Sequence, residues 1–561
     1  MQTIIDYFNY NIKNAGSKPS LVLLNDRGEK SKVLTFSELH QEVLKVAGHL
    51  QKRLNKGDRA LLLYKQNVDF IIAFMACQYI GVVAVPMSFY SSKSVHFQRV
   101  RYILKDADVS AILSTQSLNN EIQVWNESSN ILCIATDNLE EIYRLESVAL
   151  SQSDLAFLQY TSGSTSDPKG VMVSHGNLLH NSLLIKHKYQ HSSNTVMGGW
   201  LPYYHDMGLI GLILQSLYLG ATLVLMSPIA FVKNPMNWLK AISEYKITTS
   251  GGPNFCFEHC VKLYNPNKLL DVDLSHWKNC FNGAEPIREK TIDTFAKLFS
   301  QYGFKGQSFY PCYGLAEATL FVTGGNPDMK YRTLYIDSSA LSLNKIIEKQ
   351  EGDGVFAAVS SGWSYELDVI IVNPESKQQL AENEVGEIWV SGLSVAKGYW
   401  GKISLSDEVF HARTNPENGK EYLRTGDLGF LNRNELFVTG RLKDLIIING
   451  KNIYPQDIEE HVTQMDPVLF SGYSATFSLD HDHNEKIVIV QEISNRSQLD
   501  KEQFIEIKKK INLEISANFQ TPVASIEFMP KGSLPRTTSG KVQRRRVKDL
   551  WLKGELTIIN F

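Results

Sequence analysis

Short apolar runs alternate with longer segments of mixed polarity along the first part of the chain. The runs have the length of buried strands and are rich in Val, Ile, Leu and Ala: residues 59–64, 82–87, 110–115 and 131–136. Between the first two lies VDFIIAFMACQYIG (68–81), which is long enough for a helix and ends on a glycine, the usual residue after a helix C-terminus. This strand–helix alternation predicts an α/β fold with largely parallel sheets.

Two stretches without charge, residues 70–92 and 207–232, reach the length of a membrane-spanning helix. Gly81 interrupts the first and Gly220 the second, and a strand-like run follows each glycine. We therefore expect a buried helix and then a buried strand in each stretch, and no transmembrane segment. The N-terminal residues lack the basic and apolar blocks of a secretory signal, so we expect a cytoplasmic protein.

The character of the sequence changes near residue 440. FLNRNELFVTGR (430–441) is typical of a hairpin, and beyond it a strand-like KIVIVQEI (486–493) precedes a Lys/Glu-rich helical segment around 500–516. The remainder is about 120 residues long, the size of one ordinary domain. We therefore predict a large domain at 1–441 and a small domain at 442–561.

Composition and charge narrow the class of protein. The chain has 561 residues with 57 Lys and Arg against 59 Asp and Glu, a net charge of −2 that argues against a general nucleic-acid binder. A hydrophobic share of 43% excludes a mostly disordered chain. Six cysteines are too few for a disulfide scaffold. Cys256 and Cys260 lack a second Cys/His pair at zinc-ligand spacing, so we interpret them as small buried hydrophobic residues.

The most informative stretch is LQYTSGSTSDPKG (158–170), in which a short strand leads into hydroxyl residues around a glycine. Small side chains let backbone N–H groups approach an anion, hydroxyls donate hydrogen bonds, and Lys169 supplies a charge. These are the requirements of a polyphosphate site. The stretch is not the P-loop of nucleotide triphosphatases, because Lys169 precedes Gly170 and no Ser or Thr follows at the required place.

Two more motifs carry residues suited to a nucleotide. Tyr313 next to Gly314 suits stacking on a purine, and the nearby Glu317 suits a magnesium ion that bridges phosphates. Asp427, in YLRTGDLGF, is expected in a tight turn flanked by glycines, where a carboxylate can accept both ribose hydroxyls.

Two motifs carry residues suited to chemistry. WLPYYHDMGLI places His205 and Asp206 at a turn before an apolar helix, where either could also be only a helix cap. Lys541 follows Pro535 in a Ser/Gly loop, and its compact ammonium can bridge two anions.

Together these motifs resemble those of the adenylate-forming enzymes: acyl-CoA synthetases, firefly luciferases, peptide synthetase adenylation domains and fatty acyl-AMP ligases. YTSGSTSDPKGVMVSH resembles their phosphate-binding loop, with Ser166 where glycine is usual, and the likeness runs from about residue 5 to residue 548. The resemblance implies a large N-terminal domain of parallel and mixed sheets flanked by helices with a small barrel-like subdomain, and a smaller mobile α+β C-terminal domain. It also implies ATP and Mg²⁺ as cofactors.

The resemblance assigns a role to each matching residue. Lys541 becomes the catalytic lysine of adenylation, His205 lies beside the carboxylate and phosphate, Glu317 binds magnesium, and Lys443 is the pivot about which the small domain rotates. The implied nucleotide-binding residues hold the phosphates, the adenine and the ribose, with Arg441 as the partner of the ribose-binding aspartate: Thr161, Ser162, Gly163, Ser164, Thr165, Lys169, Gly283, Ala284, Glu285, Tyr313, Gly314, Asp427 and Arg441.

Several details resemble the fatty acyl-AMP ligase branch: YGLAEATL with Ala316, EIWVSGLSVAKGYW and NIYPQDIE. The segment 329–357, with a capped short helix and a Gly-containing loop in its middle, fits the extra segment that sets this branch apart. In that branch the segment packs on the small domain and limits the rotation needed to admit coenzyme A. The resemblance thus implies ATP-dependent activation of a fatty acid to an acyl-adenylate, with release of pyrophosphate, and transfer to the phosphopantetheine of an acyl carrier protein or of a carrier domain in a polyketide or peptide synthetase.

Two alternatives remain at this stage. A fatty acyl-CoA synthetase would share the first half-reaction and use coenzyme A as the acceptor. A non-catalytic adenylate-binding regulatory protein would share the fold, but the presence of Lys169, Glu317, Asp427, Arg441 and Lys541 argues against it.

A basic cluster follows the catalytic loop: Lys541, Arg544, Arg545, Arg546 and Lys548. It could be a solvated face or a nucleic-acid patch, although the near-neutral total charge argues against nucleic acid. We favour a docking surface for an acidic carrier protein.

Overall fold

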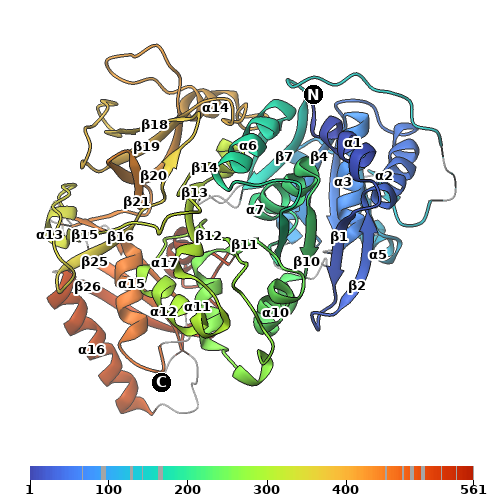
Figure 1. Ribbon diagram of the computed structural model, residues 1–561. Coiled ribbons are helices and arrows are strands. Elements are labelled where there is room, and N and C mark those ends of the chain that lie inside the picture. Colours follow the sequence, from blue (N-terminus) through green and yellow to red (C-terminus); the bar gives the residue numbers. More distant parts are fainter. Residues whose placement is uncertain are drawn as a thin grey trace.

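The computed structural model describes residues 1–65, 67–89, 97–126, 131–139, 141, 143–161, 168–448, 451–469, 473–479, 486–493, 500–519, 521–537 and 540–559. Two large sheets form the body of the protein (Figure 1). The first contains, in order, β6 (Leu132–Ala135), β5 (Ala111–Ser114), β3 (Arg59–Tyr64), β4 (Val83–Ser88), β7 (Leu155–Thr161) and β8 (Lys169–Ser174). Its strands are parallel except for β8, which runs antiparallel to β7.

The second large sheet contains, in order, β2 (Lys30–Thr35), β1 (Pro19–Leu24), β10 (Thr222–Leu225), β9 (Val196–Gly199), β11 (Thr249–Gly252), β12 (Asn279–Asn282), β13 (Phe309–Gly314), β14 (Phe321–Gly324) and β17 (Trp363–Ser364). The six strands from β1 to β13 are parallel, and the strands at both ends are antiparallel.

Helices pack on both faces of the sheet that contains β3, where its apolar side chains need to be buried. In β3, Ala60 and Leu62 join the core that the two sheets share with α1 (Ile4–Ala15), α2 (Phe36–Gln51) and α3 (Val68–Ile80), whereas Leu61 and Leu63 face α4 (Phe97–Asp106) and α5 (Gln116–Asn126). A strand buried on both faces explains why the run 59–64 is apolar throughout. The remaining helices of the body are α6 (His175–Lys188), α7 (Asp206–Gly208), α8 (Gln215–Leu219), α9 (Pro228–Lys233), α10 (Met236–Glu244), α11 (Asn254–Lys262) and α12 (Glu289–Phe299).

The expected strands and helices of the uncharged stretches are confirmed. Gly81 ends α3 and Gly220 ends α8, both with a positive φ (69° and 70°), and β4 and β10 follow. No helix in the described part of the chain has both the length and the apolar character needed to cross a bilayer.

A third, antiparallel sheet lies beside the body (Figure 1, upper left). It contains β18 (Asp368–Val372), β19 (Gly386–Ser391), β20 (Leu423–Asn432) and β21 (Glu435–Arg441), with α14 (Ile403–Phe410) packed near β20. The hairpin predicted around 432–434 is the β20–β21 turn. Below this sheet, β15 (Thr333–Asp337) pairs with β16 (Val355–Val359), and α13 (Ser338–Leu341) lies between them in sequence.

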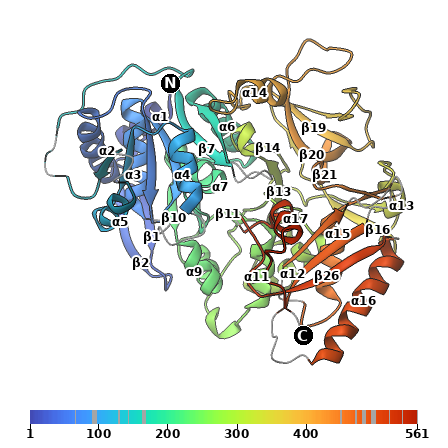
Figure 2. The ribbon, with the colours of Figure 1, turned by 180° about the vertical axis from the view of Figure 1, so that it is seen from behind.

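The C-terminal part begins after β21. It contains the pair β22 (Ile446–Ile448) and β23 (Lys451–Ile453), and a sheet of β24 (Ser474–Leu479), β25 (Lys486–Ile493) and β26 (Val523–Pro530). Helices α15 (Pro455–Gln464) and α16 (Lys501–Phe519) cover one face of this sheet, and α17 (Arg544–Leu552) covers the other. In Figures 1 and 2 this part, in orange and red, lies against α11 and α12 of the body.

Candidate active site

A cleft of about 3020 Å³ separates the body from the C-terminal part. It opens at the carboxyl ends of parallel strands β7, β12 and β13, the edge at which open α/β sheets bind ligands. The described residues predicted for the site all line this cleft: Thr161, Lys169, His205, Gly283, Ala284, Glu285, Tyr313, Gly314, Glu317, Asp427, Arg441, Lys443 and Lys541. Ser162, Gly163, Ser164 and Thr165 lie outside the described residues.

Backbone geometry explains why Gly283, Ala284 and Glu285 follow β12. A Cβ on Gly283 would lie 2.8 Å from the carbonyl oxygen of Cys312, so a larger residue would force β12 and β13 apart. Ala284 has a φ of 69°, and Glu285 then turns inward to accept a hydrogen bond of 2.6 Å from the N–H of Phe255. Burial raises the pKa of Glu285 to about 7.

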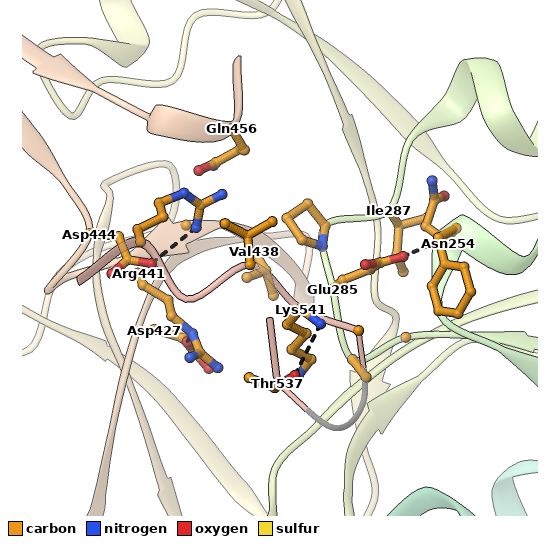
Figure 3. Close-up of a pocket in the computed structure, with 18 of the residues that line it drawn as sticks. Asn254, Glu285, Ile287, Asp427, Val438, Arg441, Asp444, Gln456, Thr537 and Lys541 are labelled. Carbon is orange, nitrogen blue, oxygen red and sulfur yellow. Dashed lines mark hydrogen bonds and ion pairs between the residues drawn. The ribbon is translucent and has the colours of Figure 1, made fainter. Parts of the chain in front are cut away.

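Tyr313, Asp427 and Arg441 form one connected group that also belongs to the body and lies across the cleft from Glu285. The Tyr313 hydroxyl donates to Asp427 Oδ2 at 2.8 Å, and Arg441 Nε donates to Asp427 Oδ1 at 3.1 Å. Figure 3 shows Asp427 beside Arg441, on the side of the cleft away from Glu285. The predicted partnership of Asp427 and Arg441 is therefore present.

The prediction of a tight turn around Asp427 is wrong. Asp427 lies within strand β20, opposite Arg441 of β21. Gly426 has a φ of 71°, and the β19–β20 register shifts beside it, so the glycine makes an irregularity in a continuous strand rather than a chain reversal.

Glu387 supports this irregular strand, and the sequence analysis missed it. Its side chain is 2% exposed and accepts hydrogen bonds from Gly426 N–H (3.1 Å), Arg424 Nε (3.0 Å) and Trp389 Nε1 (2.9 Å). A buried carboxylate with this many partners fixes the backbone next to Asp427. A glutamate within the apolar strand GEIWVS is the signal that could have revealed it.

Glu317 and Lys169 approach the cleft from different elements. Glu317 lies on a 3₁₀ turn (Ala316–Ala318) after β13 and accepts a hydrogen bond of 2.8 Å from the Tyr399 hydroxyl. Burial raises the pKa of Glu317 above its usual range, and this hydrogen bond opposes the shift. Lys169 begins β8, and burial lowers its pKa, with the nearby Lys443 acting in the same direction. The sequence analysis assigned no role to Tyr399.

His205 and Asp206 contact each other, with 2.6 Å between His205 Nδ1 and Asp206 Oδ1. His205 occupies the N-cap position of α7, but its side chain makes no capping hydrogen bond, so the helix-cap interpretation of His205 is not supported. Burial would raise the pKa of Asp206, yet His205 and Lys541 together hold it below its usual value.

Lys541 lies in the C-terminal part and lines the cleft. Thr537 N–H donates to the Lys541 carbonyl at 2.7 Å, and Lys541 N–H donates to Thr537 Oγ1 at 3.0 Å. Figure 3 shows the Lys541 side chain extending between Glu285 on one side and the Asp427 group on the other. Burial lowers the pKa of Lys541, as does Arg441, whereas Asp206, Glu285 and Asp427 raise it.

The segment around Lys443 changes partners from one residue to the next. Arg441 pairs with Asp427, and Leu442 N–H donates to the Gly426 carbonyl at 2.9 Å, so both are held by the body. Asp444 pairs instead with Arg544 of the C-terminal part, at 3.1 Å.

The prediction of a five-residue basic docking surface is wrong for Arg544. Arg544 lies inside the C-terminal part, where Nε and Nη2 each donate to the Glu459 carboxylate at 2.7 Å and Nη1 donates to Asp444. Lys541 is likewise directed into the cleft. Arg545 and Arg546 are exposed and also line the cleft, and Lys548 is half-buried, so these three are what remains of the predicted docking surface.

The segment 329–357 contains the predicted capped helix, α13, whose cap is Asp337: Ala340 N–H donates to Asp337 Oδ1 at 2.8 Å. It also contains β15 and most of β16, which were not predicted from the sequence. The tip of the segment touches the C-terminal part: Asn452 N–H donates to the Ser342 carbonyl and Asn452 Nδ2 donates to Asn344 Oδ1, both at 2.8 Å.

Comparisons with known proteins agree with this geometry. The family model for AMP-binding enzymes matches residues 9–400, and a model described as the AMP domain of Disco-interacting protein 2-like proteins matches residues 443–561. A medium-chain-fatty-acid–acyl-carrier-protein ligase of Moorena producens is 37% identical over 571 aligned positions, which cover 99% of this chain and 96% of the relative.

Two solved structures are similar over almost the whole chain. One is a fatty acyl-adenylate ligase from Legionella pneumophila in complex with acyl adenylate and pyrophosphate, with a TM-score of 0.77 and 36% identity, covering 100% of this chain and 97% of that one. The other comes from a study of fatty acyl-adenylate ligases from E. coli and L. pneumophila, with a TM-score of 0.90 and 30% identity, covering 99% and 98%. The chain therefore belongs to the AMP-binding enzyme family and is an adenylate-forming enzyme that uses ATP.

Proposed function

We propose that the enzyme activates a fatty acid to an acyl-adenylate and passes the acyl group to the phosphopantetheine thiol of an acyl carrier protein. The observation that carries the proposal is the position of Lys541, which the C-terminal part inserts between the Asp427 group and Glu285 of the body. The names of the acyl-carrier-protein ligase and the fatty acyl-adenylate ligase among the similar proteins support this choice of acid and acceptor.

The first half-reaction joins two anions. A carboxylate oxygen of the acid attacks the α-phosphorus of ATP, the bond from that phosphorus to the oxygen bridging to the β-phosphate breaks, and pyrophosphate leaves. The carboxylate is already ionised, so the step needs cations and positioning rather than a general base. Lys541 would hold the carboxylate against the α-phosphate, and Lys169 would hold the departing phosphates.

The nucleotide would lie along the wall that carries Asp427. The carboxylate of Asp427 can accept the ribose hydroxyls, and the Tyr313 ring can stack on the adenine above the backbone of Gly283 and Ala284. Thr161, at the end of β7, would contribute a hydroxyl to the phosphates. Asp206 contacts His205, and the charge of the nearby Lys541 lowers the pKa of Asp206. His205 would contact the acid's carboxylate.

The residues fit a magnesium ion held mainly by its substrate. The described part of the chain contains no cluster of three or more His, Cys, Asp or Glu side chains arranged for a metal. Glu317 is a single buried carboxylate at the cleft, and Mg²⁺ usually takes one or two protein carboxylates together with phosphates and water. Glu317 would hold this ion, which when bound neutralises charge on the phosphates.

The acyl chain needs an apolar wall, and the cleft has one. Its lining includes buried, largely apolar side chains from α6, from the residue after α6, and from β12 and β14: Ile185, Tyr189, Phe281 and Phe321. Burying each methylene group of a fatty acid there would contribute about 0.8 kcal/mol.

The second half-reaction requires the C-terminal part to move. The thiol sulfur attacks the acyl carbonyl carbon, the bond from that carbon to AMP breaks, and the thiol proton is lost to solvent. We propose residues 1–441 and 442–561 as the two units and Lys443 as the pivot, because Leu442 is held by the body and Asp444 by Arg544.

The alternative acceptor is coenzyme A, as in a fatty acyl-CoA synthetase. The contacts of Asn452 with Ser342 and Asn344 favour the carrier protein, because they connect the two units and oppose a large rotation. We propose that the segment 329–357 limits the rotation in this way.

ATP–pyrophosphate exchange tests the first half-reaction. Purified protein with ATP, Mg²⁺ and a panel of fatty acids should exchange labelled pyrophosphate into ATP, and mass spectrometry should detect the acyl-adenylate. Absence of exchange with every acid would contradict the proposal and would favour a non-catalytic adenylate-binding protein.

A further inference from the structure

Tyr399 contacts both the lysine and the carboxylate that would hold the ATP phosphates. Its hydroxyl donates to Glu317 Oε1 at 2.8 Å, and the Lys169 ammonium lies over its ring, 5.0 Å from the centroid. Tyr399 is 6% exposed and lines the cleft. One side chain therefore joins two groups that come from separate elements of the body.

The backbone around Tyr399 is bound to both of these elements. Residues 397–400 run antiparallel to β8, which begins with Lys169: Met172 N–H donates to the Gly398 carbonyl (2.9 Å) and Trp400 N–H donates to the Gly170 carbonyl (2.8 Å). Immediately before them, Ala396 N–H donates to the carbonyl of Glu317 at 2.9 Å. The segment is thus bridged to β8 at Tyr399 and connects the phosphate-loop strand to the Glu317 turn.

Packing fixes the direction of the Tyr399 ring. The ring meets Phe410 edge-on, with 5.0 Å between centroids, and Tyr399 N–H donates to Ser406 Oγ at 2.9 Å. Gly398 adopts a φ of 125°, and a Cβ there would lie 2.8 Å from the same Ser406 oxygen. The ring cannot turn away from Glu317 without disturbing α14.

Tyr399 contacts two groups of opposite charge, Glu317 and Lys169, through different parts of its side chain. Glu317 already acts on the charge of Lys169, because its carboxylate favours the protonated lysine. A direct ion pair would occupy both groups and withdraw them from substrate. The aromatic face instead attracts the ammonium, and the hydroxyl holds a single carboxylate oxygen, so each group keeps capacity for a ligand.

We propose that Tyr399 is a positioning residue that holds Glu317 in the orientation for a phosphate-bound divalent cation and holds Lys169 apart from it. The inference rests on the proposed roles of Glu317 and Lys169, but not on the fatty acid or the carrier protein. Partners that orient a metal-binding carboxylate typically change metal affinity by about 10- to 100-fold when removed.

Tyr399→Phe tests the proposal, because it removes the hydroxyl and keeps the ring. Electron paramagnetic resonance would measure Mn²⁺ binding to the protein with a non-hydrolysable ATP analogue, so no reaction is needed. We expect Mn²⁺ to bind about 10-fold more weakly than in the wild-type protein, while the affinity for the metal-free analogue changes less than about two-fold because the ring still faces Lys169.

Tyr422→Phe is the matched control. Tyr422 is also buried, at 1% exposure, and its hydroxyl donates to a carboxylate, Asp368 Oδ2, at 2.9 Å, but neither residue lines the cleft. Loss of a buried hydroxyl should lower the thermal stability of both Tyr399→Phe and Tyr422→Phe. Mn²⁺ binding should be unchanged in Tyr422→Phe. Equal Mn²⁺ affinity in Tyr399→Phe and the wild-type protein would overturn the proposal.

Two further variants separate a positioning role from a packing role. Tyr399→Leu should weaken metal-free analogue binding as well, by about two- to ten-fold, because the ring that attracts Lys169 is gone. In a Glu317→Gln background, adding Tyr399→Phe should not weaken Mn²⁺ binding further. If Glu317→Gln binds Mn²⁺ as tightly as the wild-type protein, Tyr399 cannot act through Glu317 and the proposal fails, although pyrophosphate exchange could still establish the proposed function.

Discussion

The two walls of the cleft are built differently. On the body's wall, the side chains near the nucleotide position are held by several partners: Asp427 by Tyr313 and Arg441, and the backbone next to it by Glu387. On the opposite wall, formed by the C-terminal part, the backbone of Lys541 is hydrogen-bonded to Thr537. Figure 3 shows Lys541 between Glu285 and the Asp427 group of the body.

This difference indicates a division of labour. A wall of preorganised groups can bind ATP without rearrangement, which favours affinity and orientation. A lysine on a separate unit can complete the site for one half-reaction and leave it for the next. Variants on the body's wall should therefore weaken nucleotide binding, whereas variants of the Lys541 loop should slow adenylation with little change in binding.

Lys541→Ala should have the largest effect. Removing a cation aimed at the reacting phosphate typically costs on the order of 10²–10³ in rate. ATP–pyrophosphate exchange should fall by that amount, while equilibrium binding of a non-hydrolysable ATP analogue changes less than about three-fold. Lys509→Ala, on the exposed side of α16, is the control and should exchange normally. Full exchange activity in Lys541→Ala would remove the distinction between the walls.

Asp427→Asn should come next. The amide would lose the charge that holds Arg441 and would accept ribose hydroxyls less strongly, so ATP should bind about 10- to 100-fold more weakly. Asp368→Asn is a matched control, because Asp368 also accepts from a tyrosine and a cation, Tyr422 and Lys420, but lies off the cleft. Isothermal titration with ATP should separate the two variants, and equal affinities would count against a nucleotide role for this wall.

Asn344→Gly should have a smaller effect, on the acceptor. Asn344 has a φ of 61°, which glycine tolerates, so the change removes the hydrogen bond to Asn452 without straining the turn. Loss of one hydrogen bond between the units should raise acylation of coenzyme A by about two- to ten-fold. Asn344→Asp keeps an acceptor for Asn452 and should behave like the wild-type protein. Unchanged coenzyme A acylation in Asn344→Gly would argue against a restraint at this contact.

Asp457→Asn should have the smallest effect, on stability, and only at higher pH. Asp457 lies on α15 facing the body, and burial together with Glu460 and Glu459 raises its pKa from 3.8 to about 7, against the opposing effect of Arg288 and Arg544. A carboxyl whose pKa is higher in the folded chain stabilises the fold in its protonated form, and that stability is lost as the pH rises from about 4 to about 7.

The asparagine variant should therefore melt about 2–4 °C above the wild-type protein at pH 8 and at nearly the same temperature at pH 4. Differential scanning fluorimetry across this range measures the difference. A gain that is largest at pH 4 would show that the sign is wrong.

Local patterns allowed much of the fold and the positions of the site residues to be predicted. The apolar run of β3 and the glycine ends of α3 and α8 depend on neighbouring residues, so they can be read from the sequence. The hydrogen bond between Glu317 and Tyr399 could not be predicted from the sequence, because it depends on a bridge between Tyr399 and β8 that forms only in the folded chain.

Two errors have the same physical origin. Glycines beside Asp427 are typical of a turn, but pairing with both β19 and β21 keeps the chain extended there. Arg544 belongs to a run of three arginines, and the sequence alone does not tell which of them α17 turns inward to Glu459. Tertiary pairing decides both cases.

Competition between acceptors tests the central claim most directly. Purified protein would be given ATP, Mg²⁺, a fatty acid that supports exchange, and equal concentrations of coenzyme A and a phosphopantetheinylated acyl carrier protein, with intact-mass spectrometry of both products. The account predicts acyl carrier protein as the main product and little acyl-CoA. Abundant acyl-CoA with unmodified carrier protein would contradict it and would identify an acyl-CoA synthetase instead.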